Sequence, residues 1–108
     1  MELNEYQKLA MVTSSKPNSQ LEDLLVGVMG LCGESGEVID HVKKHIAQGH
    51  ELDRNKLIEE LGDVAWYLAK CAAALDTDLE TICQMNITKL KKRYPNGFSS
   101  YDSINRKD

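Results

Sequence analysis

The chain has 108 residues, a length typical of one domain, and a formal net charge of −4 at pH 7. Hydrophobic residues make up 42% and charged residues 28% of the sequence, proportions that are ordinary for a soluble globular protein. The acidic balance argues against broad nucleic-acid binding, which usually accompanies a basic excess. The longest uncharged run, Leu24–Gly33, is too short to span a bilayer. Neither nucleic acid nor a membrane is therefore an expected partner.

Hydrophobic periodicity predicts an all-α, four-helix bundle-type domain over residues 1–108, because no segment alternates with the period of two that a half-buried strand shows. The predicted elements, in chain order, are a helix over 5–13, a loop over 14–20, helices over 21–47, 53–75 and 78–94, and a polar, partly extended tail over 95–108. Asn4 and Asp53 are the expected N-caps of the first and third helices. The stretch TDLE at 77–80 is a capping box that predicts the start of the fourth.

The cysteines and the first residues indicate a reducing compartment. Cys32, Cys71 and Cys83 are three in number, lie far apart and form no C-x-x-C pair. The chain starts without an apolar signal segment, and an odd number of cysteines without such a segment fits the cytoplasm. We expect a cytoplasmic protein in which these thiols are buried as small hydrophobic side chains.

The second predicted helix carries a glycine at every third position, at Gly27, Gly30, Gly33 and Gly36. Each interior glycine costs a helix about 1 kcal/mol relative to alanine, so four of them amount to roughly 4 kcal/mol. A solvated helix face gives no reason for this cost, whereas glycine lets another backbone or a ligand come close. We therefore expect the four glycines to form a surface of close approach.

Two acid pairs at i, i+3 lie on the second and third helices, and each projects both carboxylates in the same direction. They are Glu34 and Glu37, which share a stripe with His41, and Glu60 and Asp63. If the two helices are antiparallel, the four carboxylates converge; we call them the acid cluster. Two like charges about 4 Å apart repel by roughly 4 kcal/mol at an effective dielectric constant near 20, so the cluster needs a cation. Hard oxygen donors suit Mg²⁺ or Mn²⁺.

Other interpretations of these side chains stay open. The third-helix acids could belong to a solvated face, because Lys56 and Lys70 lie on their stripe as exposed salt-bridge partners would. His41 and His45, at i, i+4, could bind zinc, although no third soft ligand lies nearby in the sequence.

The fourth helix offers the opposite charge. Asn86, Lys89 and Arg93 share one of its faces and are called the basic stripe here. Beside the acid cluster they could hold phosphate oxygens, with Arg93 bidentate and Lys89 as a point charge. The alternative is a helix C-terminus that carries cations to suit the macrodipole. Among the aromatic residues, Tyr67 shares a helical stripe with Glu60 and Asp63 and could stack on a base. Trp66 is expected in the core or an interface.

Three stretches carry a resemblance to a known family: GLCGESGEVIDHVKK, ELGDVAWYLAK and NITKLKKRYPNGF. They look like the MazG-like nucleotide pyrophosphohydrolases, which belong to the all-α nucleoside triphosphate pyrophosphatase superfamily together with dimeric dUTPases and phosphoribosyl-ATP pyrophosphatases. The resemblance covers most of the chain, from about Leu21 to Phe98, with the elements in the family's order.

The signature of that family is E-E-x-x-E, a spacer, and then E-x-x-D. Glu34 and Glu37 match the later two glutamates of the first part, and Glu60 and Asp63 match the second part. Gly33 stands where the signature has its first glutamate, which leaves four matching carboxylates rather than five.

The resemblance implies a metal-dependent pyrophosphohydrolase that cleaves an ordinary, deoxy or modified nucleoside triphosphate to the monophosphate and pyrophosphate. The acid cluster would be catalytic and would hold Mg²⁺ or Mn²⁺, with one glutamate orienting or deprotonating the attacking water. The basic stripe would grip the phosphates. Family members assemble as homodimers or homotetramers, and a chain with so small a core gains stability in this way.

Other functions remain open from the sequence. Phosphoribosyl-ATP is the alternative substrate within the enzyme class, and a non-catalytic helical module that binds a nucleotide or a partner is the alternative outside it. A carboxylate-bridged di-iron bundle would need Glu-x-x-His on two helices. Here Glu37 and Glu60 are each followed three residues later by aspartate.

Overall fold

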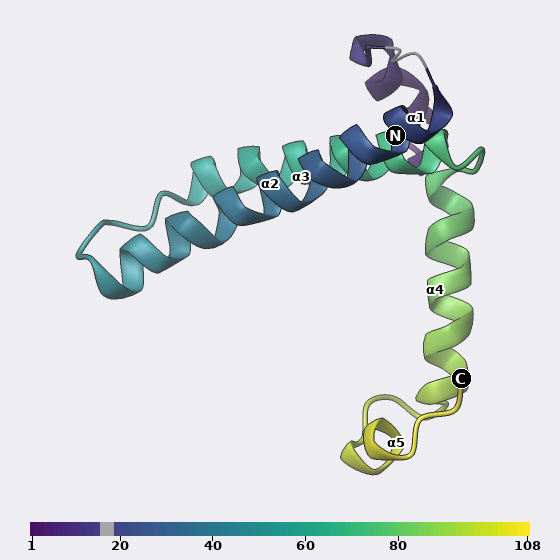
Figure 1. The fold of residues 1–108 in the computed structure, drawn as a ribbon. Helices are drawn as coiled ribbons and strands as arrows, with labels where there is room; N and C mark the ends of the chain where they lie inside the picture. The colour runs from purple at the N-terminus through teal and green to yellow at the C-terminus, as the bar shows by residue number, and fades with distance from the viewer. Residues whose placement is uncertain (16–18) are drawn as a thin grey trace.

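The computed structural model describes residues 1–15 and 19–108, and these parts of the chain are helical without a strand (Figure 1). The elements are α1 (Leu3–Ala10), a short 3₁₀ helix η1 (Met11–Thr13), α2 (Gln20–Ala47), α3 (Arg54–Ala74), α4 (Leu79–Arg93) and α5 (Ser100–Ile104). The all-α prediction is thus confirmed. The centre of the predicted 14–20 loop, residues 16–18, lies outside the described residues.

The long helices α2 and α3 form an antiparallel hairpin and lie side by side (Figure 1). Ser19 caps α2, since its side chain accepts a hydrogen bond from the backbone N–H of Glu22 at 3.1 Å. Asp53 caps α3, as predicted, by accepting from the N–H of Lys56 at 3.0 Å. Between the two helices, Gly49 has φ +73°, which lets the chain reverse direction.

Two of the four α2 glycines do permit close approach of α3. A β-carbon at Gly30 would overlap the Tyr67 ring, and one at Gly27 would come within 3.0 Å of Cys71 Sγ. A β-carbon at Gly33 or Gly36, in contrast, would meet no described atom within 4 Å. Within one chain the expected surface of close approach is therefore only half present, because α2 presents its last two glycines away from α3.

The hydrophobic core is small and lies where α1 crosses the hairpin. It consists of Ala10, Ala69, Ala72 and Leu79, with Tyr6, Met11, Trp66 and Ile82 packed against it. Trp66 joins this core as expected, and its indole N–H donates to the carbonyl of Ala10 at 2.9 Å. Alanines let the helices approach closely but bury little apolar area, so this core stabilises one chain only modestly.

The side chain of Lys70 is 1% exposed, which corrects the expectation of a surface salt-bridge partner. Its ammonium lies 2.8 Å from a carboxylate oxygen of Asp23 on α2 and donates to Ser14 Oγ at 2.6 Å. The ammonium also lies 5.8 Å from the centre of the Trp66 ring, within the range of a cation–π contact. Lys70 thus ties the segment before α2 to the open end of the hairpin, where α2 begins and α3 ends.

The cysteine prediction is wrong for two of three residues. Cys71 is buried between the hairpin helices, whereas Cys32 and Cys83 are exposed, and all three thiols are free. Cys83 lies beside Leu3 of α1, in a pocket that leaves its side chain exposed.

The first turn of α4 is capped by α1. Asp78 is the local N-cap and accepts from the N–H of Thr81 at 2.7 Å, so the TDLE box does not form as predicted. Asn4, expected to cap its own helix, instead accepts from the N–H of Glu80 at 3.1 Å, and Gln7 accepts from that of Leu79 at 2.8 Å. These long-range hydrogen bonds satisfy N–H groups that a helix start leaves unpaired.

Beyond this capped start, α4 runs away from the hairpin at a steep angle, so the helices of one chain do not close into a bundle (Figure 1). The radius of gyration is 17.0 Å, against about 13 Å for a compact domain of this length. After α4 the predicted extended tail contains the short helix α5, because the Ser99 hydroxyl accepts from the N–H of Asp102 at 3.0 Å.

Candidate metal centre

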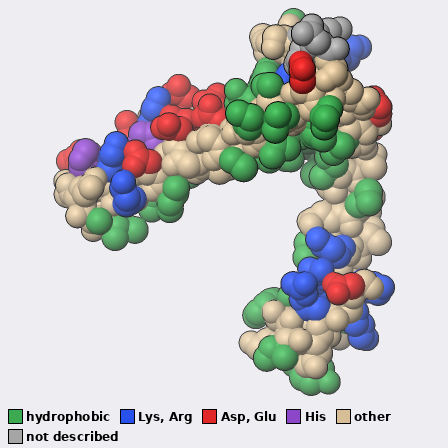
Figure 2. Space-filling view, in the orientation of Figure 1, with side chains coloured by type: hydrophobic (Ala, Val, Ile, Leu, Met, Phe, Trp, Pro, Cys, Tyr) green, Lys and Arg blue, Asp and Glu red, His purple; other side chains and the backbone are tan. Residues whose placement is uncertain are grey.

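The antiparallel hairpin brings acids of α2 and α3 together. Carboxylate oxygens of Glu34, Glu60 and Asp63 all lie within 4.8 Å of one another. Figure 2 shows the acidic side chains gathered along the hairpin. The i, i+3 spacing in each helix and the antiparallel packing together account for this convergence.

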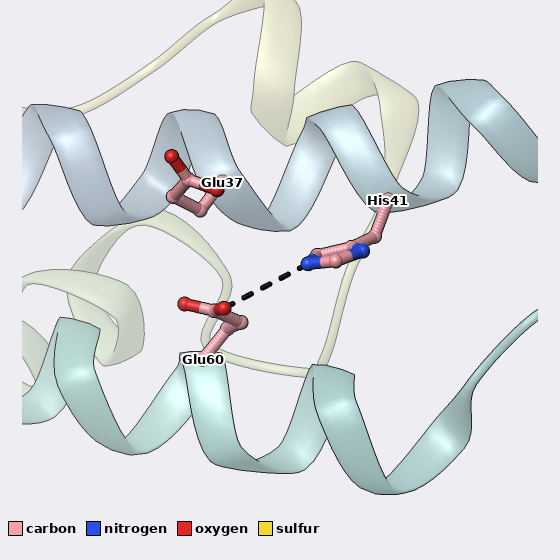
Figure 3. Close-up of side chains that lie close together, drawn as sticks. All are labelled: Glu37, His41 and Glu60. Atoms are coloured by element: carbon pink, nitrogen blue, oxygen red, sulfur yellow. Dashed lines mark ion pairs between the residues drawn. The ribbon is translucent and has the colours of Figure 1, made fainter.

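Glu60 is the centre of the cluster and its most enclosed acid, with a side chain that is 10% exposed. Its Oε1 lies 3.5 Å from the ammonium of Lys56 and 3.7 Å from Nε2 of His41. Glu60 also belongs to a second group, in which ligand atoms of Glu37, His41 and Glu60 lie within 4.8 Å of one another. Figure 3 shows His41 on α2 directed toward Glu60 on α3, with Glu37 on the same side of the view along α2.

The pKa of Glu34 reflects the burial and the negative charges within the cluster. Desolvation raises the pKa of its carboxyl group above the ordinary value of 4.5, and the negative charges of Asp63 and Glu60 raise it further. A carboxylate whose charged form is disfavoured by its neighbours gains most when a cation binds among them. The arrangement is therefore one that a divalent cation would stabilise.

The basic stripe does not meet the acid cluster within one chain. Asn86 and Lys89 are exposed on the outer part of α4, and Nη2 of Arg93 lies 2.9 Å from Asp108 Oδ1. In Figure 2 the basic side chains of this region lie far from the acidic group on the hairpin. The buried Nε of Arg93 has no hydrogen-bond partner in the described part of the chain. The direction of α4 separates the two charge sets.

Tyr67 is near the acids along α3 but packs into the helix interface. Its ring occupies the space beside Gly30 and lies edge-on to Trp66, with ring centres 4.9 Å apart. Contact with α2 thus occupies part of the face that was expected to stack on a base.

His41 shares a stripe with Glu34 and Glu37, but the sequence suggested a metal-binding role for it only together with His45. In the structure, Nδ1 of His45 lies 2.7 Å from the backbone oxygen of His50, at the turn between the helices. His41 is directed to Glu60 instead. The i, i+4 spacing of Glu37 and His41 was the signal that could have identified this pairing.

Comparisons with known proteins agree with the geometry. The model of the MazG nucleotide pyrophosphohydrolase domain matches residues 24–98. The chain is 36% identical over 114 residues to the "Gene 37 protein" of Mycobacterium phage L5, covering 98% of this chain and 100% of that protein. No solved structure matches significantly. In the described ranges, no helix is long and apolar enough to cross a membrane. Since the matched segment contains α3, α4 and nearly all of α2, the chain belongs to the MazG nucleotide pyrophosphohydrolase family.

Proposed function

We propose that this protein is a divalent-metal-dependent pyrophosphohydrolase that cleaves an ordinary, deoxy or modified nucleoside triphosphate to the monophosphate and pyrophosphate. The observation that carries the proposal is the convergence of Glu34, Glu60 and Asp63 from two antiparallel helices. Oxygen donors in this number suit Mg²⁺ or Mn²⁺, which also neutralise nucleotide phosphates. The family supports hydrolysis of a nucleotide, and the substrate and the metal are our proposal.

The four acids have distinct tasks in this mechanism. Glu34, Glu60 and Asp63 would hold the ion, and Glu37 would add a carboxylate at the exposed side of the cluster. A divalent ion held by these residues would supply Lewis-acid chemistry, making water more acidic and offsetting charge on phosphoryl oxygens. One of the glutamates would orient or deprotonate the water that attacks between the α- and β-phosphates. The bond to the oxygen bridging the α- and β-phosphates breaks, and pyrophosphate leaves.

We also infer that the working form is a homodimer or homotetramer, in which the basic stripe of one chain reaches the acid cluster of another. Three features support this assembly: the small alanine-rich core, the extended shape, and apolar residues exposed along α4. These exposed residues are Met85, Ile87 and Leu90. A partner that covers them would bury apolar area that a single chain leaves in water.

Pyrophosphate release tests the activity. We expect release from at least one of a panel of ordinary, deoxy and modified triphosphates with Mg²⁺ or Mn²⁺. Glu37→Gln and Asp63→Asn should abolish release with an unchanged circular dichroism spectrum, because each amide keeps the shape but removes an anionic ligand. Glu59→Gln is the matched control, since that side chain is 69% exposed on α3 outside the cluster. Turnover near normal in either cluster variant would refute the assignment.

The same panel, extended to phosphoribosyl-ATP, separates the alternative substrate. Nucleotide binding without pyrophosphate release from any compound would identify a non-catalytic module instead. Release confined to phosphoribosyl-ATP would assign the protein to that reaction.

Mixing two variants with complementary defects tests the composite site. Lys89→Met and Arg93→Met should each lower kcat/KM for all triphosphates alike. The expected loss corresponds to about 1.5–3 kcal/mol of transition-state stabilisation, the worth of one charge-assisted contact. Asp63→Asn mixed with Arg93→Met should regain activity through hybrids that contain one intact site. Activity no greater than the sum of the separate variants would show that the two charge sets do not meet between chains.

A further inference from the structure

We propose that His41 is a metal ligand that forms, with Glu37 and Glu60, a mixed nitrogen–oxygen subsite for a transition ion such as Mn²⁺. This subsite adjoins the all-carboxylate group of Glu34, Glu60 and Asp63. The inference rests on the metal centre of the proposed function and adds to it a ligand that determines which metal is bound.

The first support is geometric. Glu37 and His41 are one helical turn apart on α2, and their ligand atoms lie within 4.8 Å of each other and of Glu60. Nε2 of His41 lies 3.7 Å from Oε1 of Glu60. That distance is too long for a hydrogen bond. It fits two ligands of one ion, since ligand atoms about 2.0–2.2 Å from a metal can be at most about 4.4 Å apart.

The second support is the position of Glu60. It is the one acid common to both groups, and its side chain is 10% exposed. A carboxylate has two oxygens and about four lone-pair sites, so Glu60 can serve both groups at once. Lys56 at 3.5 Å already gives Glu60 a cationic partner from its own helix. The approach of His41 from the opposite helix is therefore not needed to pair that charge.

The third support is chemical. Mg²⁺ prefers oxygen ligands and keeps several waters, whereas imidazole suits later first-row ions such as Fe²⁺ and Zn²⁺, and carboxylates suit Mn²⁺. A site with one imidazole among carboxylates therefore favours a transition ion over Mg²⁺, and Mn²⁺ is the transition ion that its carboxylates also suit. The exposed fraction of the His41 side chain is 31%, so an ion can reach its ring nitrogen. His45, directed to the turn, does not contribute to this subsite.

Electron spin echo spectroscopy of the full chain loaded with Mn²⁺ alone tests the proposal. Wild-type protein should show the ¹⁴N modulation of a directly coordinated imidazole. His41→Ala should lose it, and its Mn²⁺ affinity should fall by at least about tenfold, the lower end of what loss of an outer-shell partner alone costs. Its Mg²⁺ affinity should stay near the wild-type value. His50→Ala is the matched control, an exposed histidine in the turn that should keep modulation and affinity.

Each outcome decides between the proposals. Bound Mn²⁺ without ¹⁴N modulation in the wild type overturns the role of His41, whatever the variant does, so a folding defect in His41→Ala cannot rescue the idea. Modulation that persists in His41→Ala overturns it as well. Modulation with no pyrophosphate release from any triphosphate refutes the proposed function and leaves the ligand assignment standing. Failure to bind Mn²⁺ at all overturns the role of His41, whereas the proposed function is then decided by pyrophosphate release with Mg²⁺.

Discussion

Replacing Gly30 with alanine should destabilise the protein relative to the same change at Gly33. Both positions lie inside α2, so both substitutions gain about 1 kcal/mol of helix propensity, and this term cancels in the comparison. At Gly30 the new methyl group overlaps Cδ1, Cε1 and Cζ of the Tyr67 ring, whereas at Gly33 it meets no described atom within 4 Å. Tyr67 cannot move freely, because it packs edge-on against Trp66.

The expected difference is the cost of overpacking, about 1–3 kcal/mol between the two variants. For a domain of this size each kcal/mol shifts the melting temperature by roughly 4–8 °C. Thermal and urea unfolding at one fixed protein concentration measure both quantities. Tyr67→Ala provides an internal control, because Gly30→Ala made in that background should no longer be destabilising. Equal stability of Gly30→Ala and Gly33→Ala in the wild-type background would refute the close packing of α2 on α3.

Three further predictions concern the metal and the buried charges. A divalent ion at a hundredfold excess over its dissociation constant should add about 2.7 kcal/mol to the free energy of unfolding. Identical melting curves with EDTA and with metal would show that the acids form a solvated face and not a metal site. Glu34→Gln should stabilise the metal-free protein at neutral pH, with an advantage that fades toward pH 4.5. The fold raises the pKa of Glu34. The stability that this carboxyl group contributes is therefore fully present at a pH below its ordinary pKa, and it is lost as the pH rises through the pKa of the group in the folded protein. A constant advantage at all pH values in urea titrations would contradict that cause. Lys70→Met should lower the free energy of unfolding by about 1.5–3 kcal/mol, the worth of hydrogen bonds to a charged group, and should leave KM unchanged. An unfolding midpoint equal to that of the wild type would show that the contacts of Lys70 to Asp23 and Ser14 contribute little.

Local signals predicted the hairpin well. The helical period of the apolar residues and the capping side chain of Asp53 both depend only on residues that are close in the sequence. In the structure, α2 and α3 lie within a few residues of the predicted bounds. The convergence of Glu34 with Glu60 and Asp63 followed from i, i+3 spacing once an antiparallel pair was assumed. Such spacing is sufficient because two long helices joined by a short turn have few other ways to pack.

Contacts between distant segments could not be predicted in this way. Asn4 is a good N-cap by residue type, but it caps α4 rather than its own helix. Lys70 shares a stripe with the third-helix acids, yet a few residues along the helix its surroundings change from solvent to the segment before α2. The direction of α4 depends on hydrogen bonds from α1 and not on any periodicity within α4. For the same reason the basic stripe could be recognised but not placed.

The positions of the three thiols allow a distance within the chain to be measured without introducing a new cysteine. In a single chain Cys32 lies exposed on the hairpin and Cys83 lies exposed on α4, so maleimide or spin-label reagents can reach both thiols without any substitution. Burial raises the pKa of the Cys71 thiol, which keeps it protonated and slow to react, so the two outer sites are labelled first. Within a single chain, the separation between the two labels depends on the angle between α4 and the hairpin. Spectroscopy on the natural sequence can therefore follow that angle while nucleotide and metal are added.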